Sequence, residues 1–237
     1  MLVGWSGLDL AAITTTIDPG GQRAACVSHC LTLAGRHDIP VAAGEEASLT
    51  TRRIARPVTT DERYWHAGIA PTPSPPGAAL EMLARSIQQG LTIVAIGPLT
   101  NLAQLEISRP GSLGGARVVA MGGWITPPAD GLPPWGPARD WNVQWDKHAA
   151  QTVGATADDL TLVPLPVTLE AHLRERDLPR LRAPGRSESC SHSSRKLVAM
   201  TRGWPGLPAL TPGCPMTSST FTTTRSPARW PSGGRAR

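Results

Sequence analysis

Short apolar runs alternate with helical patterns along residues 8–165, and this alternation constrains the fold more than any other feature. Strands alternating with helices are typical of a parallel α/β sheet, whose ligands bind beyond the carboxyl ends of the strands. We therefore expect an α/β chain with a Rossmann-like, open, mostly parallel sheet and flanking helices. Apolar and β-branched runs predict strands at residues 8–16, 39–44, 91–96, 118–121 and 160–165. A 3.6-residue apolar period predicts helices at residues 22–34, 77–89, 100–105 and 146–153.

Three polar motifs fall where these predicted strands end. Residues 97–101 read Gly-Pro-Leu-Thr-Asn, residues 121–123 read Met-Gly-Gly, and residues 140–142 read Asp-Trp-Asn with Asp146 four positions further on. Because parallel strands present their carboxyl ends at one edge of the sheet, we expect the three motifs to face a common crevice.

These motifs in this order, together with Leu-Val-Pro-Leu-Pro-Val-Thr at 162–168, resemble the nucleoside hydrolases of the inosine/uridine-preferring type. The resemblance covers about residues 8–182. It implies an enzyme of purine or pyrimidine salvage that hydrolyses the N-glycosidic bond of ribonucleosides to ribose and free base. It also implies a Ca²⁺ ion, held by aspartates, that orients the attacking water and the ribose hydroxyls, in keeping with the preference of Ca²⁺ for oxygen ligands.

The resemblance assigns a role to three motif residues. Thr100 takes the position whose backbone carbonyl binds Ca²⁺, although a helix N-cap is an alternative role for this residue. Met121 takes the position of a ribose contact, and an ordinary buried strand residue is the alternative. Asn142 takes the position of a ribose-binding amide, whose two donors and two lone pairs suit a diol.

Three further residues match the family less closely. Asp140 stands where the family has Glu, so its reach toward a ribose hydroxyl is shorter, and a plain turn is the alternative. Asp18 lies near the family's Gly-Asn loop and is assigned to substrate binding. His66, within residues 64–68, resembles the family's catalytic His near the leaving base, with a solvated loop His as the alternative.

One family motif is missing from the chain. The opening aspartate cluster of the form D-x-D-x-x-x-D-D does not occur, and Met1 falls just before the family's second strand. A Ca²⁺ site needs about six to eight oxygen ligands, so we expect Ca²⁺ binding to fail and hydrolysis to be weak or lost. A truncated start also removes an inner strand, which predicts an incomplete sheet with unpaired backbone groups.

The tail differs in character from the rest. We divide the chain into a nucleoside hydrolase-like domain at 1–184 and a tail at 185–237 that is rich in Ser, Thr, Pro and Arg and is expected to be unpacked. Two interpretations remain: a genuine disordered tail, or a shifted reading frame, which we favour. Suitable codons for residues 221–225 read His-His-Asp-Pro in a shifted frame, which resembles a late motif of the family.

Charge and hydropathy restrict the other classes of function. Residues 186–237 hold eight Lys and Arg and one acid, so about +7 of charge lies in the tail, although the whole chain carries +5. The charges are scattered without aromatic spacing, so a basic-tail nucleic-acid binder ranks below a non-catalytic relic that binds ribose or a nucleoside. No apolar run spans a membrane and the start does not resemble a signal peptide, so a cytoplasmic location is the default expectation. Base preference and association into a homo-oligomer stay open.

Overall fold

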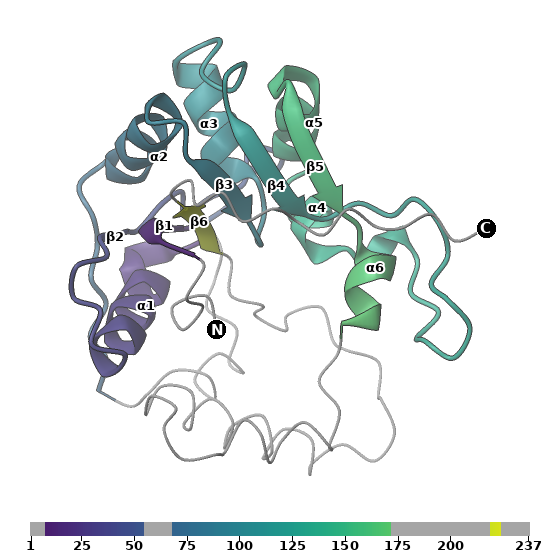
Figure 1. Ribbon diagram of the computed structural model, residues 1–237, viewed down its shortest axis with the longest axis horizontal. Coiled ribbons are helices and arrows are strands. Elements are labelled where there is room, and N and C mark those ends of the chain that lie inside the picture. Colours follow the sequence, from purple (N-terminus) through teal and green to yellow (C-terminus); the bar gives the residue numbers. More distant parts are fainter. Residues whose placement is uncertain (1–7, 55–67, 172–218, 224–237) are drawn as a thin grey trace.

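The computed structural model describes residues 8–54, 68–171 and 219–223 of the chain. Its described strands form one six-stranded sheet in the order β2-β1-β6-β3-β4-β5, as Figure 1 shows. The strands are β1 (Leu10–Thr15), β2 (Val41–Ala42), β3 (Thr92–Ala95), β4 (Arg117–Met121), β5 (Asp159–Val163) and β6 (Ser219–Thr223).

The pairing confirms the predicted α/β class. β1 pairs with β2 in parallel, and β4 pairs in parallel with both β3 and β5. β1 and β3 each run antiparallel to β6, which lies between them, so β1 and β3 point the same way. The carboxyl ends of β1, β3 and β4 therefore meet at one edge of the sheet, as the motif positions required.

β6 contradicts the expectation that the whole tail is unpacked. This strand fills the sheet between β1 and β3, with Phe221 in register with Ile13 on one side and with Val94 on the other. The prediction is thus wrong for Ser219–Thr223, and the inner gap expected in the sheet is filled. Two causes favour this pairing: Thr and Phe suit a strand, and backbone groups of β1 and β3 would otherwise lack partners. The remainder of the tail lies outside the described residues.

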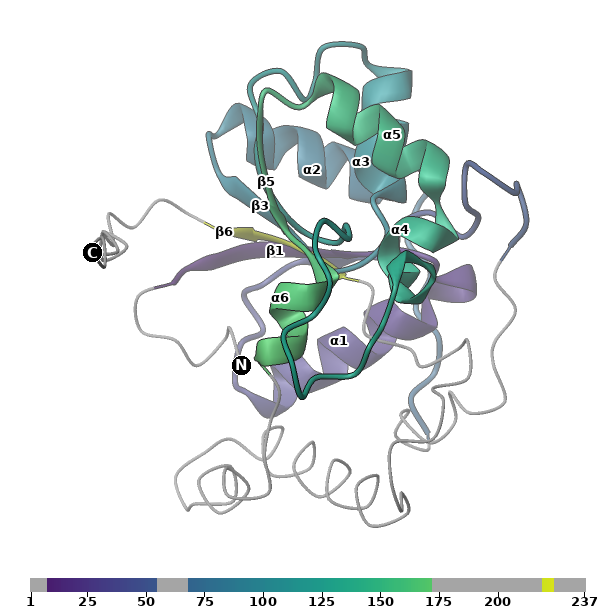
Figure 2. The same cartoon turned by 90° about the vertical axis from the view of Figure 1, so that its right-hand side faces the viewer.

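Helices cover both faces of the sheet. Figure 2 shows α2, α3 and α5 on one face, with α1 and α6 on the other. The predicted helices match α1, α2, α3 and α5. The strand predicted to reach residue 165 instead ends at Val163, because Pro164 has no amide hydrogen to donate to a neighbouring strand. The helices are α1 (Gln22–Leu33), α2 (Ala78–Gln88), α3 (Thr100–Ser108), α4 (Trp141–Trp145), α5 (Lys147–Thr156) and α6 (Leu165–Glu170), with 3₁₀ turns at Pro19–Gly21 and Pro137–Arg139.

The buried apolar side chains form two separate clusters. The larger cluster joins β3 and β4 to α2, α3 and α5, and its centre includes the fully buried Leu83, Ile93 and Val118. The smaller cluster holds Leu10 and Ile13 of β1 with two side chains from α1 and the segment before β2. α2 contacts β1, β2 and β3, so it bridges the two parts of the sheet together with β6.

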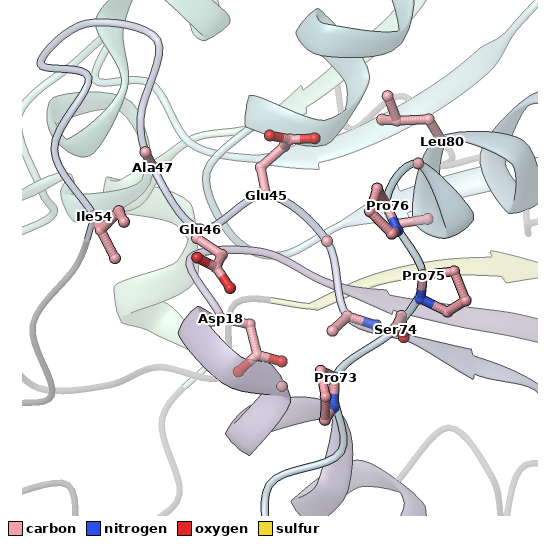
Figure 3. A pocket seen from close by; sticks show the side chains of 15 residues that line it. Asp18, Glu45, Glu46, Ala47, Ile54, Pro73, Ser74, Pro75, Pro76 and Leu80 are labelled. Atoms are coloured by element: carbon pink, nitrogen blue, oxygen red, sulfur yellow. Dashed lines mark hydrogen bonds between the residues drawn. The ribbon is translucent and has the colours of Figure 1, made fainter.

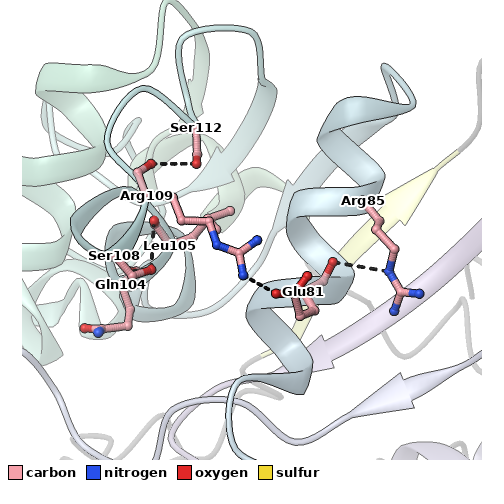
Figure 4. A network of polar contacts seen from close by, with 7 residues as sticks. All are labelled: Glu81, Arg85, Gln104, Leu105, Ser108, Arg109 and Ser112. Atoms are coloured by element: carbon pink, nitrogen blue, oxygen red, sulfur yellow. Dashed lines mark hydrogen bonds and ion pairs between the residues drawn. The ribbon is translucent and has the colours of Figure 1, made fainter.

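On the surface, α2 is also tied to the end of α3 by an ion pair. The Arg109 guanidinium donates to the Glu81 carboxylate, and Arg85 Nε donates to the Glu81 carbonyl oxygen at 3.4 Å (Figure 4). The hydrogen bond and charge of Arg109 lower the pKa of the Glu81 carboxyl. Both side chains are exposed, so this pair contributes little to stability. None of the described helices has the length and apolar character needed to cross a membrane.

Candidate functional site

Asn142 lies at the carboxyl edge of β3 and β4, where its side-chain amide contacts the backbone at the ends of both strands. Its side chain is 7% exposed, and its amide nitrogen donates to the carbonyl oxygens of Met121 at 3.1 Å and of Ile96 at 3.3 Å. The same nitrogen lies 2.9 Å from the Met121 sulfur. Because carbonyl oxygens only accept hydrogen bonds, the atom that contacts them is the nitrogen of the Asn142 side-chain amide. The oxygen of the same amide therefore points away from Met121 and Ile96. No described residue donates to that oxygen.

Asp140 begins α4 and simultaneously binds the Met-Gly-Gly motif. One carboxylate oxygen accepts from Val143 N at 3.1 Å as a helix cap, and the other accepts from Gly123 N. The side chain is only 2% exposed. Gly122 approaches the same carboxylate and has a φ of 154°, and an added Cβ there would lie 3.1 Å from the Val143 side chain. Asp140 therefore does more than close a turn: it fixes α4 against the end of β4.

Thr100 is the first residue of α3, not its N-cap. The cap position belongs to Leu99, and the Thr100 hydroxyl instead donates to the Asp146 carboxylate at 2.8 Å. Both residues are completely buried. The N-cap alternative for Thr100 is thus wrong, and the true side-chain cap nearby is Asp146, which accepts from Ala149 N at the start of α5.

Asp18 is buried beside the first turn of α1. Its carboxylate accepts from Arg23 N at 2.7 Å, from Ala24 N at 2.9 Å and from the Thr15 hydroxyl at 2.7 Å. Amides at a helix start are favourable partners for a buried negative charge. These bonds use both oxygens of Asp18, which lies at the base of a neighbouring cavity.

That cavity has a volume of about 410 Å³ and opens between the loop after β2 and the segment before α2. Figure 3 shows the Asp18 and Glu46 carboxylates on one side of the opening, with Pro73, Pro75 and Pro76 on the other. Glu46 Oε1 accepts from Gly20 N at 3.0 Å. Burial, and secondarily the charge of Glu46, raise the pKa of Glu45.

Asn101 fixes the loop after β2, whose residues line this cavity. Its amide nitrogen donates to the Thr15 carbonyl at 2.7 Å, and its oxygen accepts from Glu45 N at 2.9 Å. Gly44 lies within this junction, where an added Cβ would come within 2.2 Å of the Thr15 carbonyl oxygen and 2.5 Å of the Asn101 side chain. Only glycine fits this close approach, so the loop after β2 is held firmly to the end of β1.

The described part of the chain offers no side-chain cluster that fits a Ca²⁺ site. Among residues 8–54, 68–171 and 219–223, no group of three His, Cys, Asp or Glu side chains is placed to hold a metal ion. The three buried aspartates of this edge, Asp18, Asp140 and Asp146, accept backbone amides at helix starts. A cluster of six to eight oxygens is what Ca²⁺ requires. His66 lies outside the described residues.

The sequence pattern of the inosine-uridine preferring nucleoside hydrolases matches residues 1–221, which is most of the chain. The chain belongs to this family. A pyrimidine-specific ribonucleoside hydrolase RihA from Salmonella agona is 36% identical over 166 residues, covering 67% of this chain and 52% of the relative. The RihA of Citrobacter koseri is 34% identical over 187 residues, covering 75% and 58%. The chain thus spans about half the length of the curated relatives it matches.

Solved structures agree on the fold. A plant nucleoside hydrolase, PpNRh1, superposes with a TM-score of 0.62 at 20% identity, covering 82% of this chain and 72% of that one. A purine-preferring ribonucleoside hydrolase from Gardnerella vaginalis gives a TM-score of 0.61 at 19% identity, covering 86% and 70%. The family pattern over residues 1–221 confirms the resemblance predicted from the three motifs.

Sequence reasoning missed the residues that hold the site together. The motifs include Asn101 and Asp146 without indicating a role for either, and the sequence pattern places Gly44 at the end of a strand. Each acts through partners far away in the sequence, such as Asp146 with Leu49 and Thr50. Asp146 did carry one local signal, because an Asp directly before a helix is a frequent N-cap.

Proposed function

We propose that this chain is a ribonucleoside N-glycosidase by descent that binds the ribose of a nucleoside at the carboxyl edge of β3 and β4 and hydrolyses the nucleoside slowly. Asn142 is the main ribose-binding residue in this proposal. The observation that carries it is the fixed Asn142 amide, whose nitrogen is used by Met121 and Ile96 and whose oxygen stays available to accept a hydroxyl hydrogen. Met121 and Asp140 flank it as substrate contacts.

Slow hydrolysis follows from the chemistry of the described edge. Cleavage of an N-glycosidic bond requires an activated water and stabilisation of an oxocarbenium-like sugar. Family members supply these with Ca²⁺ and aspartates. The three buried aspartates of this edge, Asp18, Asp140 and Asp146, are engaged by backbone amides, and the Thr100 carbonyl offers one neutral ligand. We therefore propose that Ca²⁺ does not bind and that His66, if it meets the leaving base, cannot by itself replace the metal-bound water.

A second candidate is binding without any turnover. The same observations favour it, since the proposed ribose contact is present while no metal-binding group occurs in the described part of the chain. The two candidates differ only in whether free base is released. Base preference belongs to the test: the relatives named above are pyrimidine-specific, whereas the Gardnerella vaginalis structure is purine-preferring.

The test is calorimetric titration of the full chain with uridine, inosine and ribose, beside an assay for released base with and without Ca²⁺. We expect millimolar to micromolar binding of a nucleoside, negligible release of base and no rise in Tm with Ca²⁺. Asn142→Ala should weaken binding about tenfold, because a hydroxyl contact worth about 1 kcal/mol or slightly more is lost. Gln144→Ala, on the same helix, is the matched control and should bind like the wild type.

Three outcomes would contradict the proposal in whole or in part. If none of the three ligands binds, the proposal is contradicted altogether. Equal binding by the wild type and Asn142→Ala contradicts the assignment of the site. Rapid, Ca²⁺-dependent release of base would show that residues outside the described ranges complete the metal site, and it would overturn the proposal of weak activity.

A further inference from the structure

Asp146 is a completely buried carboxylate that accepts hydrogen bonds from three separate parts of the chain. One oxygen accepts from Leu49 N at 2.8 Å and from the Thr100 hydroxyl at 2.8 Å. The other accepts from Thr50 N at 3.2 Å, from the Thr50 hydroxyl at 2.9 Å and from Ala149 N at 3.1 Å. A buried charge is tolerated where donors surround it in this way.

The donors come from the turn after β2, from the start of α3 and from the start of α5. Thr50 strengthens the junction, because its hydroxyl also accepts from His148 N at 3.0 Å. The same turn is tied further back to Asn101, which accepts from Glu45 N. One carboxylate thus fixes the mutual positions of segments that are 46 to 97 residues apart in sequence.

Asp146 also stands at the boundary between α4 and α5. It is the residue that ends α4 and the N-cap of α5. α4 has only five residues, so its position depends on its two ends, Asp140 at the start and Asp146 at the finish. Asn142 lies on this short helix, with its amide directed at the carboxyl ends of β3 and β4.

We infer that Asp146 is a positioning residue, which holds α4 against the start of α3 and thereby sets the orientation of the Asn142 amide. The inference rests on the proposed function in one respect, namely that the Asn142 amide binds ribose. Asp146 is completely buried, so its effect on the site is transmitted through α4. Its carboxylate is required because the contacts include three backbone amides, and a side-chain NH₂ group cannot accept from an amide.

The experiment compares Asp146→Ala, Asp146→Asn and Thr50→Val by two measurements on the full chain. The first is the NMR signal of the Asn142 side-chain NH₂, identified by its loss in Asn142→Ala. The second is uridine affinity well below the Tm of each variant. Thr50→Val removes the hydroxyl contacts with Asp146 and with His148 N but leaves the Asp146 carboxylate and its contact with the start of α3, so it is the matched control.

Asp146→Ala should move the Asn142 NH₂ signal toward that of an exposed amide and lower uridine affinity about tenfold. Asp146→Asn keeps one accepting oxygen, so it should produce a smaller change of the same kind, and it serves if the alanine variant does not fold. Thr50→Val should lower the Tm and leave the Asn142 signal and the affinity unchanged. This pattern separates positioning from general stabilisation.

Two results overturn the inference: an unmoved Asn142 signal in folded Asp146 variants, or an equal movement in Thr50→Val. Failure of the wild type to bind any nucleoside contradicts the proposed function instead. The NMR measurement needs no ligand, so it still decides whether Asp146 sets the Asn142 amide.

Discussion

The part of the sheet formed by β3, β4 and β5 and the part formed by β1 and β2 are built in different ways. The first packs against α2, α3 and α5 through a cluster that buries Leu83, Ile93 and Val118 completely. The second has four buried residues in its apolar cluster, and buried polar side chains hold its carboxyl end in place. Apolar burial is the dominant stabilising term in folding, so most of the folding free energy belongs to the first part.

This difference explains where the candidate site lies. Asn142, Met121 and Thr100 all sit on the part with the larger cluster, where the backbone is held by close packing. The loop after β2 is tied to the same edge by hydrogen bonds with Asn101 and Asp146. The hydrogen bonds of Asn101 and Asp146 therefore set the position of the loop beside the candidate site, whereas the apolar cluster contributes most of the stability of the fold.

The strand that joins the two parts gives the largest predicted effect. β6 has neighbours on both sides, so each of its amides faces β1 or β3. Thr222→Pro removes one of these donors and leaves a carbonyl unpaired, and we expect a loss of stability on the order of 5 kcal/mol. Thr222→Val keeps the amide and the β-branched shape and should change the Tm little. Equal Tm values for the two variants, measured by circular dichroism, would show that β6 does not join the sheet.

Core truncations should rank the two clusters next. Leu102 is 1% exposed in the larger cluster, and Leu31 is 5% exposed in the smaller one. We expect Leu102→Ala to cost about 4 kcal/mol and Leu31→Ala about 2 kcal/mol, because the denser surroundings leave a larger unrelieved cavity. Urea denaturation measures both. A cost for Leu31→Ala that equals or exceeds that of Leu102→Ala would contradict the ranking.

Gly44 tests the polar junction directly. Gly44→Ala places a methyl group within 2.5 Å of backbone and Asn101 atoms, and overpacking of this kind costs about 1 to 3 kcal/mol. Gly154 in α5 is the control, since nothing lies within 4 Å of its added Cβ. Gly154→Ala should stabilise the chain by about 0.5 to 1 kcal/mol through helix propensity. Thermal unfolding should therefore shift in opposite directions, and a shift in the same direction would argue against the tight junction.

The smallest expected effect is a pH dependence at Glu45. Burial raises the pKa of Glu45 above its ordinary value of 4.5, so the protonated form is favoured by folding. Its contribution to stability is complete below about pH 4.5 and is lost as the pH rises through the raised pKa. Glu45→Gln should accordingly exceed the wild type in stability at pH 7 and lose that advantage in acid.

Glu81 provides the control of opposite sign. Arg109 lowers the pKa of Glu81, so the stability that this pair contributes is lost as the pH falls through the lowered pKa. Glu81→Gln should therefore be less stable than the wild type at pH 7, and the stabilities of the two proteins should converge in acid. Denaturation curves at several pH values check both signs, and parallel curves for the wild type and Glu45→Gln would contradict the effect of burial.

Much of the fold could be predicted because its signals are local. A 3.6-residue apolar period marked α2, and β-branched apolar runs marked β3 and β4. Three motifs at strand ends then indicated the edge that carries the site. β6 could not be predicted, because its five residues stand in a Ser- and Thr-rich stretch without periodicity, and its partners lie more than a hundred positions earlier.

The candidate site was predicted in part for the same reason. The motifs gave the positions of Asn142 and Asp140, but not the atoms they bind. The contacts between Asn142 and Ile96 and between Asp146 and Leu49 span 46 and 97 residues, and no local pattern specifies such pairs. Hydrogen-bond partners of buried polar groups are set by the packing of whole elements, which sequence spacing does not report.

Native-state hydrogen exchange tests most directly whether one part of the sheet is held by a large apolar cluster and the other by a strand and polar hydrogen bonds. The amides of Ile93 and Val118 should exchange only through global unfolding, at the free energy given by denaturation. The amides of Ile13 and Thr14 should exchange faster, through an opening that leaves β3 and β4 intact. Equal protection of the two pairs of amides, at the global free energy of unfolding, would contradict this division and show that the sheet unfolds as a single cooperative unit.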